Sequence, residues 1–194
     1  MSDDVAAGAV IIGAGAGKRF GGPKAVAALP DGRRFLDAVV ETAVLALLSP
    51  VVAVLPPGVQ APDGVRVVTN PAPESEQIVS VRLGLAQLTN TPVTAALVWP
   101  VDHPFVQPES IRALLDGARR SNASIVVPTY DGRRGHPTLF HRDTWGELMT
   151  LGSGGARAVI QRPAQRVLEV PVPDAGVVRG INTRDDLASA LRSR

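Results

Sequence analysis

Both lysines of this chain lie in one glycine-rich segment that directly follows a short apolar run. The segment extends from Gly13 to Lys24 and contains Lys18, whereas the chain uses arginine for its other strongly basic side chains. Glycines after a strand allow main-chain N–H groups to approach a ligand closely, and nearby cations neutralise bound phosphates. The alternative is a pair of solvated surface lysines that fall together by chance. The placement favours a site for a phosphorylated ligand.

The spacing of these glycines differs from two common phosphate-binding loops. A P-loop needs a serine or threonine directly after its lysine, but Arg19 follows Lys18. A dinucleotide fingerprint that begins at Gly13 would need a glycine at position 18 and an acidic residue after the second strand. Position 18 is a lysine, and no acidic residue lies at the required distance. The P-loop is therefore excluded, and the dinucleotide fingerprint is a weak match.

Short apolar runs alternate with longer segments of helical periodicity. We predict strands at Ala9–Ile12, Val51–Leu55, Val65–Thr69, Ala95–Val101 and Ile125–Pro128, and helices at Phe35–Leu48, Gln77–Leu88, Pro108–Arg120 and Asp185–Leu191. Continuous apolar strands that alternate with helices are typical of a parallel sheet covered on both faces. We therefore expect an α/β fold, a three-layer αβα sandwich around a mostly parallel, doubly wound sheet. The glycine loop and Asp102, each after a strand, should then face one crevice.

Composition limits the classes of protein that fit. A chain of 194 residues that is 45% hydrophobic can bury one sizeable core, so we expect a single domain over residues 1–194. A formal net charge of +2 does not favour nucleic-acid binding, and the lack of cysteine excludes a thiolate metal site or nucleophile. The acidic N-terminus and the lack of an apolar stretch near the ~20 residues that span a bilayer favour a cytoplasmic protein without a membrane partner.

The glycine loop resembles the signature L-A-[AG]-G-x-[SG]-x-R-[MF]-G-x-P-K of the MobA-like nucleotidyltransferases. From Ile12 to Lys24 the chain reads I-G-A-G-A-G-K-R-F-G-G-P-K, with Ile12 in place of leucine and Gly13 in place of alanine. The resemblance covers nearly the whole chain, because further family elements are matched at Asn70-Pro71, Ser80 to Leu85, Val101 to Phe105, Gly135-His136-Pro137, Gly152 to Arg157 and Ile181 to Leu187.

This resemblance implies both a fold and a reaction. The fold would be that of the Rossmann-like nucleotide-diphospho-sugar transferases. The reaction would be Mg²⁺-dependent transfer of a nucleoside monophosphate from a triphosphate to a phosphorylated acceptor, molybdopterin or the molybdenum cofactor, with release of pyrophosphate. Such a transfer needs positioning and charge stabilisation rather than a covalent nucleophile. A molybdoenzyme that receives the product is an expected partner.

The resemblance also implies roles for single residues. The expected catalytic residues are Arg19, Lys24 and Asp102, and Asp102 with Asn182 would bind Mg²⁺. Nucleotide binding would involve Ile12, Gly13, Ala14, Gly15, Gly17, Lys24, Asn70 and Ser80. The acceptor would contact His136 and Arg157. A second role stays open for three of these residues, because Asp102 and Asn182 are also suited to cap a following helix and His136 to make a structural hydrogen bond in a turn.

Two departures from the family pattern put acceptor recognition in question. Ser153 stands where the family usually has aspartate, and Glu76 stands where it usually has glycine. Ala14 and the Gly135-His136-Pro137 element resemble the cytidylyl branch, so we expect CTP as the donor, with GTP as the runner-up. Two further hypotheses stay open. One has a sugar phosphate as the acceptor, and the other is a nucleotide-binding accessory protein of molybdoenzymes that does not turn over.

Overall fold

The computed structural model describes residues 5–72, 74–150, 160 and 166–192. The strands are β1 Ala7–Ile12, β2 Val51–Leu55, β3 Arg66–Thr69, β4 Ala95–Pro100, β5 Ile125–Tyr130, β6 Arg133–Arg134, β7 Thr138–His141 and β8 Val167–Pro171. The helices are α1 Phe35–Leu45, α2 Gln77–Ala86, α3 Pro108–Arg119, α4 Trp145–Thr150 and α6 Arg184–Arg192, and short 3₁₀ turns include η1 Lys24–Val26 and η4 Ala175–Val178.

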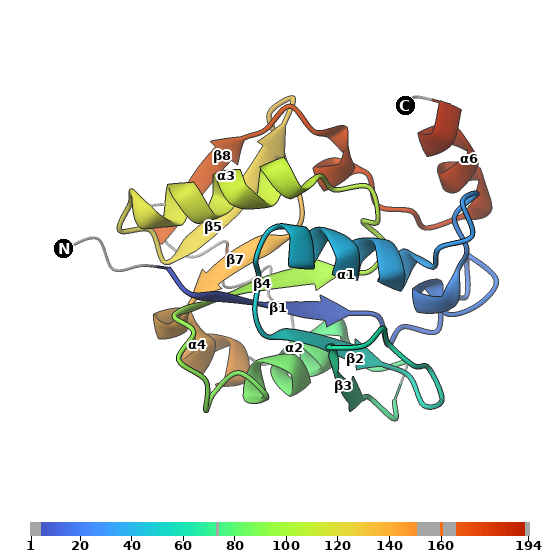
Figure 1. The fold of residues 1–194 in the computed structure, drawn as a ribbon, viewed down its shortest axis with the longest axis horizontal. Coiled ribbons are helices and arrows are strands. Elements are labelled where there is room, and N and C mark those ends of the chain that lie inside the picture. The colour runs from blue at the N-terminus through green and yellow to red at the C-terminus, as the bar shows by residue number, and fades with distance from the viewer. Residues whose placement is uncertain (1–4, 73, 151–159, 161–165, 193–194) are drawn as a thin grey trace.

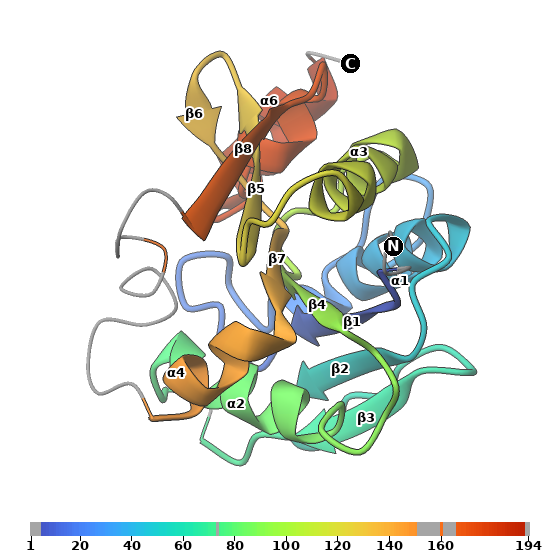
Figure 2. The same ribbon diagram turned by 90° about the vertical axis from the view of Figure 1, so that its left-hand side faces the viewer.

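All eight strands belong to one sheet. Its order is β3-β2-β1-β4-β7-β5-β6, and β8 pairs with β5. The pairs among β3, β2, β1 and β4 are parallel, and so is the pair of β5 with β8, whereas β7 runs antiparallel to both β4 and β5. Helices α1 and α3 cover one face, and α2 and α4 cover the other (Figures 1 and 2). The predicted αβα sandwich with a mostly parallel sheet is therefore confirmed.

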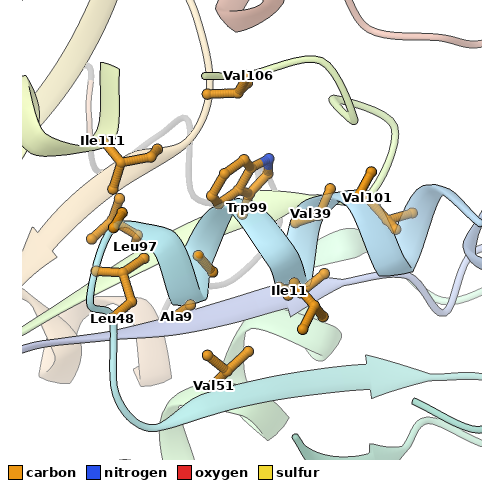
Figure 3. Close-up of a cluster of buried hydrophobic side chains, with 14 of the residues drawn as sticks. Ala9, Ile11, Val39, Leu48, Val51, Leu97, Trp99, Val101, Val106 and Ile111 are labelled. Carbon is orange, nitrogen blue, oxygen red and sulfur yellow. The ribbon is translucent and has the colours of Figure 1, made fainter. Parts of the chain in front are cut away.

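The central strands are apolar on both faces because each face contacts a separate hydrophobic core. Every residue of β1 and β4 is buried. Ile11 belongs to the core under α1 and α3, whereas its neighbour Val10 belongs to the core under α2. Figure 3 shows the first core, with Ile11 of β1, Trp99 of β4 and Val39 of α1 around one packed centre. This packing fixes the carboxyl ends of β1 and β4 side by side.

Four strands differ from the expectation. The prediction of cover on both faces was wrong for β3, where Arg66, Val67 and Thr69 are exposed, because β3 is an edge strand. Strands β6, β7 and β8 were not predicted. Strands β6 and β7 have only two and four residues, which carry too little periodicity to be recognised, and β8 is only partly buried and lacks the continuous apolar run of the central strands.

The predicted helices are present, with small differences at their ends. Helices α1, α2 and α3 begin at the predicted residues, but α1 ends at Leu45 rather than Leu48, and Leu47 beyond it has a left-handed φ of 62°. Helix α6 extends one residue beyond each end of the predicted 185–191 segment. Within the described ranges, no helix is both long enough and apolar enough to cross a bilayer.

Substitution of Gly84 tests the packing of α2 against β1. A Cβ at Gly84 would lie 2.2 Å from Val10 Cγ1, so Gly84→Ala should lower the free energy of unfolding by about 2 kcal/mol. Gly146→Ala in α4 is the matched control, because its Cβ would meet nothing within 4 Å and should leave stability equal or slightly higher. Urea denaturation measures both. Equal stability of the two variants would contradict this packing.

Candidate active site

A cavity of ≈ 310 Å³ opens where β1, β3 and β4 end. It brings together the glycine loop after β1, the end of β3, the start of α2 and the segment after β4. Its lining residues are Ile12, Gly13, Ala14, Gly15, Gly17, Lys18, Arg19, Lys24, Asn70, Ser75, Gln77, Ser80, Pro100, Val101, Asp102 and Asn182. The expectation that the glycine loop and Asp102 face one crevice is therefore confirmed, and the expected nucleotide-binding, catalytic and metal-binding residues line it.

Gly17 is the residue around which the glycine loop folds back. Its φ is +61°, and its carbonyl oxygen accepts hydrogen bonds from the N–H groups of Phe20, Gly21 and Gly22 at 2.9, 3.0 and 3.2 Å. A Cβ at Gly17 would lie 1.8 Å from the carbonyl oxygen of Gly22. The turn therefore needs glycine at this position for both its backbone conformation and its space. It returns the chain to the cavity at Lys24.

Within the described part of the chain, the fold of this loop leaves a row of main-chain donors without partners. The N–H groups of residues 14–19 donate to none of the carbonyl or side-chain acceptors in the part of the chain that the structure describes. The N–H of Gly13, by contrast, donates to the carbonyl of Val54 at 2.9 Å and continues the sheet. Consecutive free N–H groups beside a cavity provide a site for an anion, because they donate hydrogen bonds without adding a mobile side chain.

The ammonium group of Lys24 joins the glycine loop to two distant segments. Lys24 Nζ lies 2.8 Å from Asp102 Oδ2 and donates to Asn182 Oδ1 at 2.9 Å. The guanidinium of Arg19 also donates to Asn182 Oδ1, at 3.3 Å. The side chains of Lys24 and Asp102 are only 16% and 22% exposed, so their charges are partly shielded from solvent. The structure thus brings the three expected catalytic residues and Asn182 into one polar cluster.

Asn182 does not take the role of a helix cap. Thr183 caps α6 instead, because its Oγ1 accepts the N–H of Asp186 at 3.1 Å. Asp186 accepts the N–H groups of Asn182 and Thr183 at 2.9 and 2.8 Å, and these bonds lower the pKa of the Asp186 carboxyl. The Asn182 backbone is therefore held from the helix side while its amide oxygen faces Lys24 and Arg19.

Asp102 does not cap the next helix either. The N-cap of α3 is Gln107, and Asp102 lies in the turn that follows β4. Its carbonyl accepts the N–H of Ile181 at 2.8 Å, and this hydrogen bond holds the segment that contains Asn182 beside Asp102. Asp102 Oδ2 contacts Lys24, whereas the buried Asp102 Oδ1 has no hydrogen-bond partner among the described residues. One carboxylate oxygen is therefore available for a ligand.

A pair of histidines lies behind Asp102. His103 is buried, its Nδ1 is 3.2 Å from the carbonyl oxygen of Gly176, and its ring packs edge-on against His136 at 4.9 Å. Burial is the main cause that lowers the pKa of both histidines, that of His136 to about 4. Both rings are therefore neutral at pH 7. The 3.9 Å approach of His103 Nε2 to Asp102 Oδ1 is accordingly not an ion pair.

Of the two expected acceptor-binding residues, His136 lies in the described part of the chain. His136 does not line the cavity but contacts His103 behind Asp102. Arg157 and Ser153 lie outside the described residues. Glu76 is exposed at the N-cap of α2, where its side chain makes no capping hydrogen bond. The expected acceptor contacts stay predictions.

A separate polar cluster, between the end of β3 and the first turn of α2, also lines the cavity. Asn70 Nδ2 donates to Ser75 Oγ at 3.2 Å and to Ser80 Oγ at 3.1 Å, and Asn70 is buried. Asn70 and Ser80 were predicted from the sequence, whereas Ser75 and Gln77 were not, and Lys18 had no predicted role. No family element covers Ser75 or Gln77. The polar run between the end of β3 and the start of α2 was the one signal that could have drawn attention to them.

The oxygens around Lys24 also have the chemistry of a site for a hard cation. Asp102 and Asn182 offer a carboxylate and an amide oxygen, the ligand types that Mg²⁺ and Mn²⁺ prefer. Asp102 Oδ1 has no protein partner within the described part of the chain, and it would gain one in such a cation. No group of three or more His, Asp or Glu side chains suited to a metal is found among the described residues. Substrate phosphates would have to complete the coordination, as is common for Mg²⁺.

Comparison with known proteins agrees with this geometry. The model of the MobA-like NTP transferase domain matches residues 9–170, which include the glycine loop, Asn70, Ser80 and Asp102. The chain belongs to the MobA-like NTP transferase family. The resemblance found in the glycine loop is therefore confirmed, and so is the enzyme class of nucleotidyltransferase.

Relatives of this MobA-like NTP transferase match along most of the chain. A probable molybdenum cofactor guanylyltransferase from Mycolicibacterium paratuberculosis is 25% identical over 197 residues and spans all of both chains. A molybdenum cofactor guanylyltransferase from Cupriavidus metallidurans is 31% identical over 133 residues, 64% of each chain. The crystal structure of Rv0371c from Mycobacterium tuberculosis has a TM-score of 0.83 at 26% identity over 98% of this chain and 100% of that one. A manganese complex of Rv0371c has a TM-score of 0.78 at 27% identity, covering 97% of this chain and 99% of that one.

The histidine pair makes the stability of this transferase depend on pH. The pKa of His136 is about 4 in the folded protein, against 6.5 for an ordinary histidine, so between these values the unfolded chain binds more protons. The contribution of His136 to the free energy of unfolding should be complete above pH 6.5. The free energy of unfolding should then fall by up to about 3 kcal/mol as the pH drops to 4. His136→Gln should flatten this fall in urea denaturation between pH 7 and 4. An unchanged slope in the variant would contradict the assignment.

Proposed function

We propose that this chain transfers a nucleoside monophosphate from a nucleoside triphosphate to the molybdenum cofactor or its molybdopterin form, with release of pyrophosphate. The observation that carries the proposal is one cavity, lined by the glycine loop, in which the Lys24 ammonium contacts Asp102 and Asn182. The N–H groups of residues 14–19 in this loop have no partner among the described residues. This arrangement provides donors for a polyphosphate beside a carboxylate. The names of the curated relatives support a molybdenum cofactor as the acceptor.

In this proposal the chain acts by positioning anions and balancing charge. The N–H groups of residues 14–19 would hold the phosphates of the donor, and Arg19 and Lys24 would neutralise the charge that grows on the leaving pyrophosphate. An acceptor phosphate oxygen would attack the α-phosphorus in line, forming one P–O bond as the bond to pyrophosphate breaks. No covalent intermediate with the protein is required.

A divalent cation fits this proposal, and Mg²⁺ is the one we propose. Asp102 and Asn182 would hold it, and the structure of Rv0371c in complex with manganese supports the uptake of such an ion by a protein of this fold. When bound, the ion would neutralise phosphate charge during transfer. Lys24 would then exchange its contact with Asp102 for one with the phosphates, since both the ion and the ammonium favour the same carboxylate.

The names of the relatives support GTP as the donor. Two full-length relatives and one partial relative are named as guanylyltransferases, whereas the sequence resemblance had favoured CTP. Ala14 lines the cavity and keeps CTP as the second candidate. The other support for CTP, the element around His136, lies behind Asp102 rather than in the cavity lining.

Pyrophosphate release tests the proposal. Purified protein with Mg²⁺ and molybdopterin or the molybdenum cofactor should release pyrophosphate with GTP, and more slowly or not at all with ATP and UTP. Faster release with CTP would reverse the order of the two donors. Release with sugar phosphates but not with the cofactor would replace the acceptor. Triphosphate binding without release under any acceptor would favour an accessory protein that does not turn over.

Asp102→Asn is the variant that links this reaction to the cavity. It keeps the size of the side chain but removes its charge, so turnover should fall by about two orders of magnitude or more, with little change in unfolding. Asp116→Asn on the solvent side of α3 is the matched control and should keep the wild-type rate. Wild-type turnover in the Asp102 variant would remove this residue from the active site.

A further inference from the structure

The carboxyl end of α1 exposes three large apolar side chains within four residues. Val44 and Leu45 are 56% and 54% exposed, and Leu47 is 88% exposed. In the part of the chain that the structure describes, six large apolar side chains are exposed, so half of them lie in this one short segment. Single exposed apolar residues are ordinary, whereas a group of them marks a surface that another molecule covers.

The backbone at Leu47 has a conformation that favours glycine. Leu47 follows the C-cap of α1, its φ is 62°, and its N–H donates to the carbonyl of Val44 at 2.9 Å. The N–H of Leu48 donates to the carbonyl of Ala43 at 3.0 Å, which completes a Schellman motif. Glycine is the usual residue at this position, because the left-handed conformation is unfavourable for a bulky side chain. Leucine is therefore unfavourable here for two reasons, its backbone and its exposure, and burial against a partner would offset both.

Helix α3 lies beside this apolar end. Figures 1 and 2 show α1 and α3 side by side on one face of the sheet. The guanidinium of Arg112 donates to the carbonyl of Leu45 at 2.9 Å. Leu47 lines a cavity of ≈ 450 Å³ whose other walls include Arg112, Asp116 and Arg119. The apolar end of α1 and the middle of α3 therefore belong to one surface.

The charges on α3 form a pattern that is antisymmetric about the middle of the helix. Positions 109, 112, 116 and 119 are spaced i, i+3, i+7 and i+10, which places them in one row along a helix. The side chains in this row are all exposed, and they are Glu109, Arg112, Asp116 and Arg119. Position 114 is midway between 112 and 116 and also midway between 109 and 119. In both of these pairs one member is acidic and the other is basic.

This row and the three exposed apolar residues of α1 are here called the α1/α3 face. We propose that the α1/α3 face binds a second copy of this chain and forms a dimer with two-fold symmetry. The two α3 helices run antiparallel with position 114 at the axis, so Glu109 of one copy meets Arg119 of the other, and Arg112 meets Asp116. A two-fold axis also brings residues near it into contact with their own counterparts. Because the end of α1 lies beside Arg112, the two Leu47 side chains meet near this axis.

The charge pattern favours a copy of this chain over a partner of another kind. A strongly acidic or strongly basic partner would meet like charge at two of the four positions, whereas an antiparallel copy meets opposite charge at all four. Within each chain Arg112 also lies 2.9 Å from Glu109, and Arg119 lies 3.2 Å from Asp116. Exposed ion pairs contribute little free energy, so the charges set the register of the dimer. Burial of the apolar end of α1 supplies the affinity.

Sedimentation velocity of the full chain tests the dimer. As the protein concentration rises, the mean mass should change from that of one chain to that of two, with a dissociation constant in the micromolar range. A mass of one chain at every concentration up to about 0.1 mM would overturn the inference.

Leu47→Gly removes the apolar contact while it suits the backbone. The dissociation constant should rise by about a hundredfold, because the substitution occurs twice in each dimer. The urea midpoint of the monomer should stay equal or rise, since glycine adopts this φ without strain. Leu47→Asn, which also tolerates the left-handed conformation, should act in the same way. Met149→Gln in α4, an exposed apolar residue on the opposite face of the sheet, is the matched control and should leave the dissociation constant unchanged.

A reversal of charge tests the antiparallel register. Asp116→Arg should raise the dissociation constant by about tenfold, because Arg112 would then meet an arginine at both symmetric positions. Adding Arg112→Glu to this variant restores opposite charges across the axis and should return the dissociation constant to within about threefold of wild type. Asp63→Arg, in the exposed loop before β3, makes the same change of charge and should have no effect.

The outcomes separate this inference from the proposed function. The cavity beside Leu47 is also lined by Val5 and Ala7 at the start of β1, whereas the active-site cavity opens where β1 ends and is lined by one chain. Pyrophosphate release should therefore be the same in Leu47→Gly as in wild type. A dimer that neither Leu47→Gly nor Asp116→Arg weakens would have its interface elsewhere and would overturn the inference alone. A dimer with the expected sensitivities, in a protein that releases no pyrophosphate, would support the inference and contradict the proposed function.

Discussion

The contact of one ammonium group with two oxygens determines how the site of this protein is assembled. Lys24 lies 78 residues from Asp102 and 158 residues from Asn182 along the chain, yet its Nζ contacts both. A partly buried carboxylate is stabilised by a compensating charge and a partly buried ammonium by acceptors, so the three side chains stabilise one another in this position. The contact therefore holds the glycine loop, the end of β4 and the segment before α6 around one cavity.

The sheet makes this contact possible. Strands β1 and β4 are adjacent and parallel, so the segments that follow them emerge at the same edge. Both strands are buried on both faces, and the two cores leave little freedom for either strand to shift. Beyond the strands, the left-handed conformation of Gly17 turns the loop so that its N–H groups and Lys24 return to the cavity. The apolar sheet thus supplies rigidity, and the glycines supply the shape.

The sequence predicted the features that depend on local patterns. The buried strands, the helix starts, the glycine loop and the position of Asp102 all follow from hydrophobic runs or from a family signature, and the structure brings them together as expected. The features that were not predicted depend on contacts between residues that are distant in sequence. The antiparallel β7 between β4 and β5, the exposed edge of β3 and the burial of His136 against His103 have no local signal. Ser75 was missed for the same reason, since its place is set by a hydrogen bond from Asn70.

The proposed reaction rests on one central claim, that a triphosphate and a divalent ion share the cavity at Lys24 and Asp102. A crystal structure with an unreactive triphosphate analogue and Mn²⁺ tests it most directly, because anomalous scattering locates the ion. We predict an anomalous peak at the oxygens of Asp102 and Asn182, with the phosphates on the N–H groups of residues 14–19 and on Lys24. An ion bound elsewhere, or a triphosphate outside the cavity while Lys24 keeps its contact with Asp102, would contradict the account.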